Sequence, residues 1–346
     1  MTRRHFLLLK GAGDFYRRSL ILFSHELARR SRDGSHRLPN PSCNLLRGLG
    51  SSSVGVVPAH APQARYTAYR VSNNGRIKQS LAYWCLNATE WQWDIHRICE
   101  IAVRLGCASV ELSPPELWPV VKAHGLENAL ALNGMPDPVF ARGLNNPRYH
   151  EEVITRTRQA IDLCADHGVP NVIAFTGYRW LDADDPSSGE IPAEQGAAHT
   201  VKGLREIAAY AAPRHVNVVL EHLNTRDDSH PMKGHPGYQG DDIDYCAEIV
   251  RRVDSEHAKL LFDVYHVAIM NGDVIRRIRR YAKWIGHVHV AGVPGRGELD
   301  HSQEIHFPGV MRALVDSGYQ GYVGQEFIPT RDPEEGLAHA VALCHL

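Results

Sequence analysis

The stretch Val216-Asn217-Val218-Val219-Leu220-Glu221-His222-Leu223-Asn224 is an apolar run that ends in charged and polar side chains. A second such run, Leu260-Leu261-Phe262-Asp263, follows further along the chain, and 42 residues separate Glu221 from Asp263. Apolar runs that are continuous rather than alternating are typical of parallel strands covered on both faces. We therefore expect residues 216–224 and 259–266 to be neighbouring strands of a buried parallel sheet.

The same pattern extends outward from these two strands over residues 76–346. Apolar runs at 79–86, 109–113, 128–133, 171–177, 285–291 and 322–329 complete a set of eight expected strands. Residues with helical periodicity lie between them, at 91–105, 151–167, 194–212, 242–253, 273–284 and 307–317. Eight strand–helix units in roughly 270 residues fit an α/β fold of the (β/α)8 type, a TIM barrel in one domain. An open doubly wound sheet is disfavoured because neither a GxGxxG nor a Walker sequence is present.

The N-terminal part of the chain has a different composition. Residues 1–65 hold 11 basic and 3 acidic side chains, which leaves 27 basic and 36 acidic for the rest. We interpret residues 1–75 as a basic, irregular leader. Its start, TRRHFLLL at residues 2–9, resembles a twin-arginine export signal, and Ala59-His60-Ala61 resembles a cleavage site. Lys10 and Asp14 interrupt the apolar run, so a disordered or partner-docking tail on a cytoplasmic protein is the alternative to export.

The overall composition limits the possible partners. The formal net charge of -1 gives no indication of a nucleic-acid partner. No apolar run approaches the 18 residues of a membrane-spanning helix. The 7 cysteines include no CxxC pair, so we expect them to be small apolar core residues rather than zinc ligands or a disulfide framework.

Four polar residues occupy equivalent positions on four consecutive expected strands. A barrel carries its chemistry at the C-terminal ends of its strands. Closure would bring together three carboxylates and one imidazole there, a donor set suited to a divalent cation such as Mn²⁺ or Mg²⁺. The alternative is that each acid pairs with an arginine or caps the next helix. The four expected ligands are Glu221, Asp263, His289 and Glu326.

Two further residues belong to the same rim. His266 lies three residues after Asp263, and Arg296 lies in the turn Val293-Pro294-Gly295-Arg296-Gly297. A guanidinium at that place is able to bind a substrate carboxylate through two parallel hydrogen bonds. We therefore predict that His266 and Arg296 bind substrate. The alternatives are a core histidine bonded to backbone carbonyls and an arginine of a surface turn.

Several motifs resemble those of hydroxypyruvate isomerases, which belong to the xylose-isomerase-like TIM-barrel superfamily. The resemblance covers nearly all of residues 76–346 and none of the leader. It rests on Leu220-Glu221 with Asn224-Thr225-Arg226-Asp227, on Phe262-Asp263-Val264-Tyr265-His266, on Gly286-His287-Val288-His289 with Pro294-Gly295-Arg296-Gly297-Glu298, and on Gly321-Tyr322-Val323-Gly324-Gln325-Glu326.

The resemblance implies a reaction and a role for each residue. Glu221 and Glu326 would bind the metal and serve as the acid/base pair, and Asp263 would be a ligand. Hydroxypyruvate would become 2-hydroxy-3-oxopropanoate through an enediolate, by metal-assisted proton transfer and without an organic cofactor. The position of His289 often holds Gln in hydroxypyruvate isomerases and His in the related ketose 3-epimerases, so the substrate is a small hydroxy-keto acid or a sugar.

An insertion and two rival functions complete the predictions. Residues 228–240, which include His230, Lys233 and His235, follow the fifth strand and would overhang the site as a lid. An endonuclease IV type nuclease needs additional ligands for three metal ions and a basic face, and the acidic body disfavours it. A barrel that binds metal or sugar without turnover is disfavoured because both Glu221 and Glu326 are present.

Overall fold

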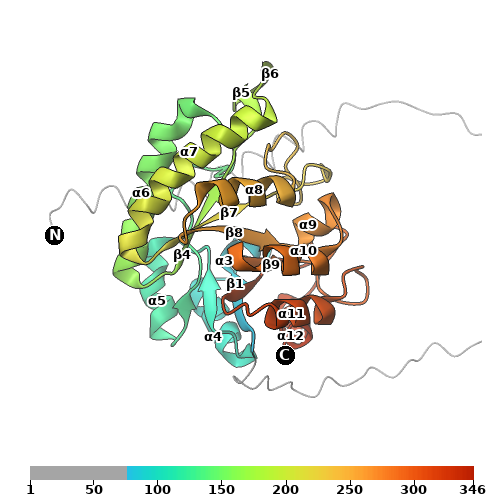
Figure 1. The fold of residues 1–346 in the computed structure, drawn as a ribbon. Helices are drawn as coiled ribbons and strands as arrows, with labels where there is room; N and C mark the ends of the chain where they lie inside the picture. Colours follow the sequence, from blue (N-terminus) through green and yellow to red (C-terminus); the bar gives the residue numbers. More distant parts are fainter. Residues whose placement is uncertain (1–75) are drawn as a thin grey trace, which may run out of the picture. The chain divides into compact units, whose positions relative to one another are not determined.

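Eight parallel strands form the central sheet of residues 76–346, the part of the chain that the computed structural model describes (Figure 1). Their hydrogen-bonded order is β3-β2-β1-β10-β9-β8-β7-β4, so strands that are consecutive along the chain lie side by side. The strands are β1 (Lys78–Ala82), β2 (Ser109–Glu111), β3 (Glu127–Asn128), β4 (Asn171–Phe175), β7 (Asn217–Glu221), β8 (Ala258–Asp263), β9 (Ile285–Val290) and β10 (Tyr322–Gln325).

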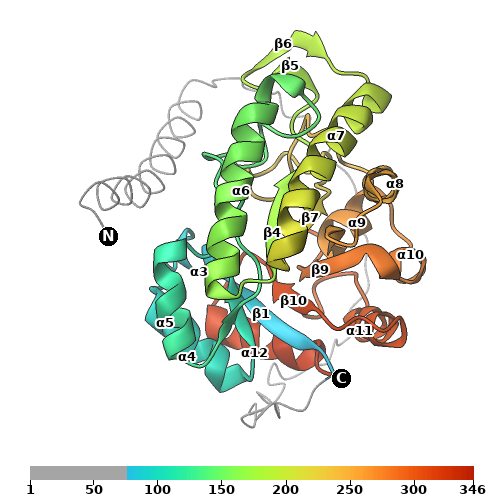
Figure 2. The same ribbon diagram turned by 60° about the vertical axis from the view of Figure 1, so that its left-hand side comes forward.

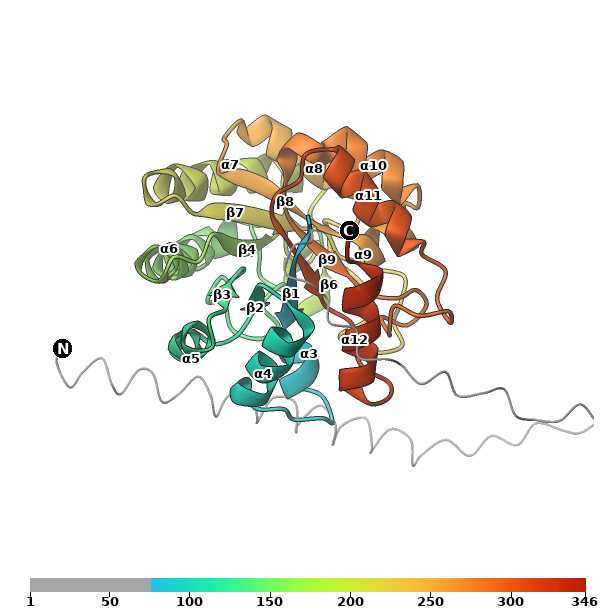
Figure 3. The ribbon, with the colours of Figure 1, turned by 90° about the horizontal axis from the view of Figure 1, so that it is seen from below.

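The two ends of this sheet meet and close it into a barrel. Ala131, three residues after β3, forms a parallel bridge to Val172 of β4. The Ala131 N–H donates to the Asn171 carbonyl at 2.9 Å, and the Ala131 carbonyl accepts from the Ile173 N–H at 3.0 Å. Figure 3 shows the strands with helices around them. The predicted TIM barrel is confirmed, whereas the predictions for the leader, residues 1–75, lie outside the described residues.

Helices follow the strands and pack on the outside of the barrel. Figure 2 shows α6 and α7 side by side over β4 and β7. The helices are α3 (Tyr83–Asn87), α4 (Ile95–Leu105), α5 (Trp118–Ala123), α6 (His150–His167), α7 (Ala193–Ala211), α8 (Ile243–Val253), α9 (Val264–Met270), α10 (Val274–Tyr281), α11 (Phe307–Asp316) and α12 (Pro333–Leu343). Short 3-10 turns occupy Pro115–Leu117, Pro147–Tyr149, Ala212–Arg214 and Ala282–Trp284. None of the helices within residues 76–346 has the length and apolar character needed to cross a membrane.

Local sequence signals set the ends of several helices. The Asp94 side chain accepts from the Arg97 N–H at 2.9 Å and caps the start of α4. Gly106 and Gly168 follow α4 and α6 in the left-handed region, with φ of 75° and 71°, where glycine avoids the steric cost of a Cβ. Each of these two glycines therefore marks the end of its helix.

Each predicted strand ends earlier than expected, and in two of them a helix begins within the predicted range. The strand predicted at 79–86 stops at Ala82, and residues 83–87 form α3. The strand predicted at 259–266 stops at Asp263, because the Asp263 carboxylate accepts from the Tyr265 N–H at 2.7 Å and begins α9. His266 consequently lies in the first turn of α9 rather than on a strand.

Some elements lack a clear sequence pattern and were not predicted. These are the short or weakly amphipathic helices α3, α5, α9 and α12, and an antiparallel hairpin formed by β5 (Trp180–Asp182) and β6 (Asp185–Glu190). The hairpin lies beside α7 and outside the barrel sheet (Figure 1). Its second strand reads DPSSGE and is mostly exposed, so it shows neither the composition nor the alternation of a buried strand.

Apolar side chains fill two separate regions. A large cluster packs the outer face of the strands against the helices. A smaller cluster includes Val219 and Leu261, each two residues before Glu221 and Asp263 on the same strands. Because side chains two residues apart share one face of a strand, this cluster lies on the same barrel-facing side as those two acids. Its buried members are Leu112, Leu130, Ile173, Phe175, Val219, Leu223, Tyr238 and Leu261.

Candidate active site

The C-terminal ends of four strands bring the expected carboxylates and imidazole together. Glu221 and Asp263 are the last residues of β7 and β8. His289 lies on β9 opposite Asp263 in the strand register, and Glu326 directly follows β10. One ligand atom from each of the four lies within 4.8 Å of the others, and all four side chains are buried. Their grouping is thus observed, while their roles remain predictions.

Two cationic side chains lie among these carboxylates. His289 Nδ1 is 2.9 Å from Glu326 Oε2 and 3.5 Å from Glu221 Oε1. Arg296 Nη2 donates to Glu326 Oε2 and lies 3.6 Å from Asp263 Oδ2. Glu326 therefore has the closest cationic partners, and Glu221 has fewer.

This asymmetry separates the pKa values of the two glutamates. Burial raises the pKa of Glu221 to about 7, and the charges of Glu326 and Asp263 act in the same direction. Burial opposes ionisation of Glu326 as well, but His289 and Arg296 outweigh it and lower the pKa of Glu326 to about 2. Two carboxyl groups whose pKa values are driven apart are a common arrangement in acid/base catalysis.

The donor set fits a divalent cation. Three buried carboxylates are costly unless a positive charge neutralises them. Asp263 Oδ1 caps α9, as the helix-cap alternative anticipated, but Asp263 Oδ2 is buried without a hydrogen-bond partner among residues 76–346. Three carboxylate oxygens and one imidazole nitrogen suit ions such as Mn²⁺ or Mg²⁺.

His266 is held in place by its neighbours. Its Nδ1 accepts from the Asn224 N–H at 3.0 Å and lies 2.8 Å from Asn224 Nδ2. Its Nε2 lies 3.5 Å from Asp263 Oδ2. Burial lowers the pKa of His266, and the charge of Arg296 adds to the effect, so the ring is neutral. The predicted substrate-binding residue therefore lies beside the expected ligand Asp263. Its Nδ1 is bonded to Asn224 and not to the backbone carbonyls that the alternative required.

Arg296 is a buried residue of the site. It has a positive φ of 55°, and its side chain is only 4% exposed, so the surface-turn alternative is wrong. Its Nη1 donates to the Met232 carbonyl at 2.7 Å. Its guanidinium carbon lies 5.2 Å from the ring centroid of Trp84 and 5.6 Å from that of Tyr265. The two aromatic rings and the insertion thus fix the position of its positive charge.

The insertion at 228–240 packs against the site. The Lys233 carbonyl accepts from the Tyr265 hydroxyl at 2.8 Å and from Asn224 Nδ2 at 2.7 Å. The His235 ring is buried and lies 4.2 Å from the ring of Phe140, which comes from the loop after β3. Residues 228–240 therefore contact side chains that come from both halves of the barrel.

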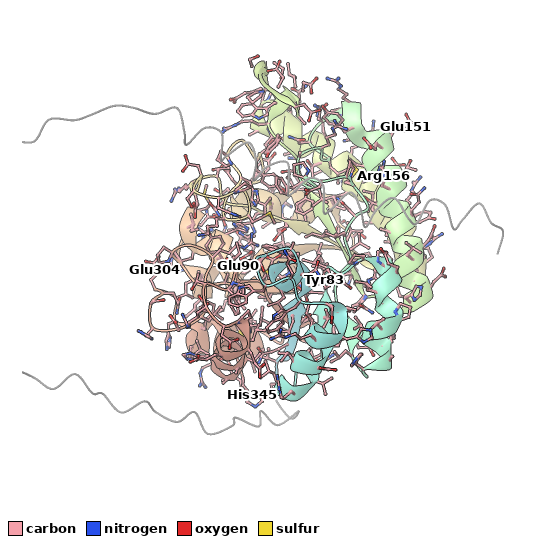
Figure 4. The ribbon with its side chains drawn as sticks, turned by 180° about the vertical axis from the view of Figure 1, so that it is seen from behind. Tyr83, Glu90, Glu151, Arg156, Glu304 and His345 are labelled. Atoms are coloured by element: carbon pink, nitrogen blue, oxygen red, sulfur yellow. The ribbon has the colours of Figure 1, made fainter. Side chains whose placement is uncertain are left out.

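Sequence reasoning missed two residues that contact this group. Trp84 Nε1 donates to Glu326 Oε1 at 2.9 Å. Trp84 lies on α3, whose first residue, Tyr83, is labelled near the middle of Figure 4. Glu111, at the C-terminal end of β2, lies 2.8 Å from His289 Nε2. The strand-end position that singled out the other acids also applies to Glu111 on the observed bounds of β2.

A closed parallel barrel with helices on its outside and buried acidic side chains at its strand ends defines the class of α/β-barrel proteins. The model of the xylose isomerase-like TIM barrel family matches residues 99–344, and the chain belongs to this family. The predicted superfamily is thereby confirmed.

Relatives of known name are similar to part of the chain. A human protein that carries the provisional name of hydroxypyruvate isomerase is 36% identical over 180 residues, which cover 52% of this chain and 61% of the human protein. The 2-oxo-tetronate isomerase of Cupriavidus necator is 34% identical over 173 residues, 49% of this chain and 64% of that protein. Each alignment thus spans less than two thirds of the relative.

Solved structures share the barrel over a larger part of the chain. The crystal structure of a family 2 AP endonuclease from Brucella melitensis has a TM-score of 0.63 and 25% identity, and covers 76% of this chain and 98% of that one. A D-psicose 3-epimerase solved with D-fructose has a TM-score of 0.61 and 18% identity, and covers 77% and 97%. The second similarity shows the fold alone.

Proposed function

We propose that this protein is an isomerase that interconverts hydroxypyruvate and 2-hydroxy-3-oxopropanoate by proton transfer between adjacent carbons. The observation that carries the proposal is the pair of buried glutamates, Glu221 and Glu326, on either side of His289, with the guanidinium of Arg296 beside them. The names of the human and Cupriavidus relatives, both isomerases of small hydroxy-keto acids, support this substrate class.

The expected metal site consists of Glu221, Asp263, His289 and Glu326. A divalent cation bound there would act as a Lewis acid and stabilise negative charge on the substrate oxygens. The remaining steps belong to the side chains. Arg296 would bind the substrate carboxylate in a charge-assisted pair, and residues 228–240 would keep water away from the reacting carbons.

The reaction requires one glutamate to accept a proton from the first carbon and the other glutamate to deliver a proton to the second carbon. Both oxygens of Glu326 already have donors, Trp84 Nε1 on Oε1 and Arg296 Nη2 on Oε2. Within residues 76–346, the one nitrogen donor near the Glu221 carboxylate is His289 Nδ1, at the longer distance of 3.5 Å. A carboxylate that accepts fewer hydrogen bonds is the stronger base. We therefore assign to Glu221 the removal of the first proton from the substrate.

The bond changes balance within the substrate. Glu221 removes a proton from the hydroxymethyl carbon, and the electron pair of that C–H bond forms the enediolate double bond. Glu326, which starts ionised, takes the hydroxyl proton from that same carbon atom and delivers it to the former carbonyl carbon. Glu221 then returns its proton to the former carbonyl oxygen, so both carboxylates are restored. Because no electrons leave the substrate, no organic cofactor is required.

A ketose 3-epimerase is the second candidate. His289 favours it, since His at this position is usual in epimerases, and D-psicose 3-epimerase shares the fold. Arg296 favours the keto acid, because a buried guanidinium recognises a carboxylate and a neutral sugar has none.

The deciding experiment is NMR of C–H exchange in D₂O, with and without Mn²⁺ or Mg²⁺. Hydroxypyruvate, 2-oxo-tetronate and a small panel of ketoses would be compared. Metal-dependent exchange and isomerisation with a keto acid support the proposal. Turnover of ketoses alone would move the function to sugar epimerisation, and turnover of none would contradict both candidates.

A further inference from the structure

Glu111 of β2 and His289 of β9 come from strands that are not neighbours, yet the two side chains meet. The strand order places β1 and β10 between β2 and β9. Gly324 of β10 lies opposite His289 in the register and contributes no side chain to this space. A Cβ at position 324 would come within 2.2 Å of Glu111 Oε1. The absence of a side chain at Gly324 therefore makes room for the Glu111 carboxylate.

The Glu111 carboxylate holds two imidazole rings. Its Oε1 lies 2.8 Å from His289 Nε2 and 3.1 Å from His287 Nε2. All three side chains are completely buried. Since an ionised carboxylate only accepts hydrogen bonds, Nε2 of His289 carries a proton and donates it to Glu111.

The opposite edge of the same ring faces the glutamates. His289 Nδ1 lies 2.9 Å from Glu326 Oε2. Because its Nε2–H is donated to Glu111, the ring is able to bind a cation only through Nδ1, which gives up its own proton when the cation binds. His289 is shared between two groups of side chains that could hold an ion, one with Glu111 and His287 and one with Glu221, Asp263 and Glu326. The direction of the ring therefore favours the second group.

We propose that Glu111 is a positioning residue that fixes the His289 ring so that Nδ1 points at the cation site formed with Glu221, Asp263 and Glu326. The inference rests on the cation site of the proposed function and goes beyond it by giving Glu111 a role. A carboxylate that accepts from the outer nitrogen of a metal-binding histidine is a common way to set its tautomer and orientation. Gly324 contributes to this arrangement, because its lack of a side chain leaves room for the Glu111 carboxylate.

The test measures Mn²⁺ binding by calorimetry without substrate, together with the visible spectrum of the Co²⁺ form. Glu111→Leu removes the acceptor and is expected to weaken Mn²⁺ binding by about 10- to 100-fold and to change the Co²⁺ spectrum. Glu111→Gln keeps a neutral hydrogen-bond acceptor and is expected to lose less Mn²⁺ affinity than Glu111→Leu. The matched control is Ser109→Ala, a buried change two residues earlier on the same face of β2, which should leave Mn²⁺ affinity within threefold.

A double-mutant cycle shows whether Glu111 acts through His289. In the His289→Gln background, the effect of changing Glu111 on Mn²⁺ affinity should shrink to within about threefold. An equal loss in both backgrounds, or wild-type affinity and spectrum in Glu111→Gln and Glu111→Leu, would overturn the proposal. If Glu111→Leu fails to fold, Glu111→Gln carries the same cycle.

Two further outcomes separate this inference from the proposed function. Undiminished Mn²⁺ binding in Asp263→Asn, with loss in Glu111→Gln, would place the ion in the group of Glu111 and overturn the positioning role. Absence of Mn²⁺ binding in the wild type would overturn the cation site itself and the positioning role with it. Mn²⁺ binding that does not depend on Glu111 would overturn the positioning role alone.

Discussion

The two halves of the barrel rim differ in chemistry. The charged group lies at the ends of strands β7 to β10, with Arg296 beside it. Apolar side chains lie at the ends of β2 to β4 or shortly after them, among them Leu112, Leu130 and Phe175. Buried charge needs a compensating charge in a fixed place, but apolar contacts tolerate changes of shape. The comparison indicates that the charged half determines the reaction and the apolar half determines fit. Glu111 is an exception, because it lies on a strand of the apolar half and contacts His289 of the charged half.

The largest expected effect comes from neutralising the charged half. Glu221→Gln should lower kcat by roughly 10²- to 10⁴-fold and abolish C–H exchange, because the first proton acceptor is lost. Glu326→Gln should abolish isomerisation to the same extent but retain exchange at the hydroxymethyl carbon. Product formation and deuterium incorporation are measured in the same NMR time course. Circular dichroism checks that both variants stay folded.

The control for this pair is Glu304→Gln, which neutralises an exposed carboxylate labelled in Figure 4 and should leave kcat unchanged. Exchange that survives in Glu221→Gln and disappears in Glu326→Gln would reverse the assigned order. Full isomerisation in Glu326→Gln would show that Glu221 carries both transfers alone.

The next largest effect concerns Arg296. Arg296→Gln should lower kcat/KM for hydroxypyruvate by roughly 10- to 100-fold, as expected when a hydrogen bond to a charged group is lost. Arg296→Lys keeps the positive charge and should lower kcat/KM less. Turnover of a neutral ketose should fall less, because it loses only the effect of Arg296 on Glu326. Arg331→Gln, which breaks a more exposed ion pair with Asp300, is the matched control. Equal losses for both substrate classes would contradict the role of Arg296 in binding a carboxylate.

The sequence predicted the charged residues of the site better than the residues that hold them in place, Glu111 and Trp84. Glu221 and Asp263 could be found because each follows an apolar run and one strand–helix unit separates them. Glu111 was passed over because it lies in the middle of the predicted strand at 109–113 and ends only the observed strand β2. Its partners also lie across two intervening strands, and Gly324 makes the contact possible. Trp84 was assigned to a strand because the five-residue helix α3 is too short to show helical periodicity.

A smaller effect is expected where the insertion meets the apolar half. Burial lowers the pKa of His235 to about 3, and the charge of Arg296 contributes in the same direction, while Glu326 opposes it. The folded protein therefore keeps His235 neutral, whereas the unfolded chain takes up a proton below pH 6.5. Stability is retained above that pH and lost progressively as the pH falls toward 3, on the order of 2 kcal/mol between pH 7 and pH 5.

Urea unfolding at pH 7, 6 and 5 measures this contribution. His235→Phe keeps an aromatic ring against Phe140 but cannot be protonated, so its free energy of unfolding should fall less between pH 7 and pH 5 than that of the wild type. His215→Phe, at an exposed position on the outside of the barrel, is the control and should follow the wild type. Parallel curves for His235→Phe and wild type would mean that His235 is not the group responsible.

The smallest effect is expected from the apolar half itself. The Phe140 ring lies 6.2 Å from that of Phe175, which ends β4, and 4.2 Å from that of His235. Phe140→Ala should remove support for the insertion and raise KM by roughly tenfold, as expected for the loss of a partly buried ring, with kcat and Mn²⁺ affinity within threefold of wild type. Phe140→Leu keeps apolar volume and should resemble wild type. A fall in kcat or in Mn²⁺ affinity as large as the change in KM would contradict the division between the two halves, because it would mean that the apolar side also positions the charged group.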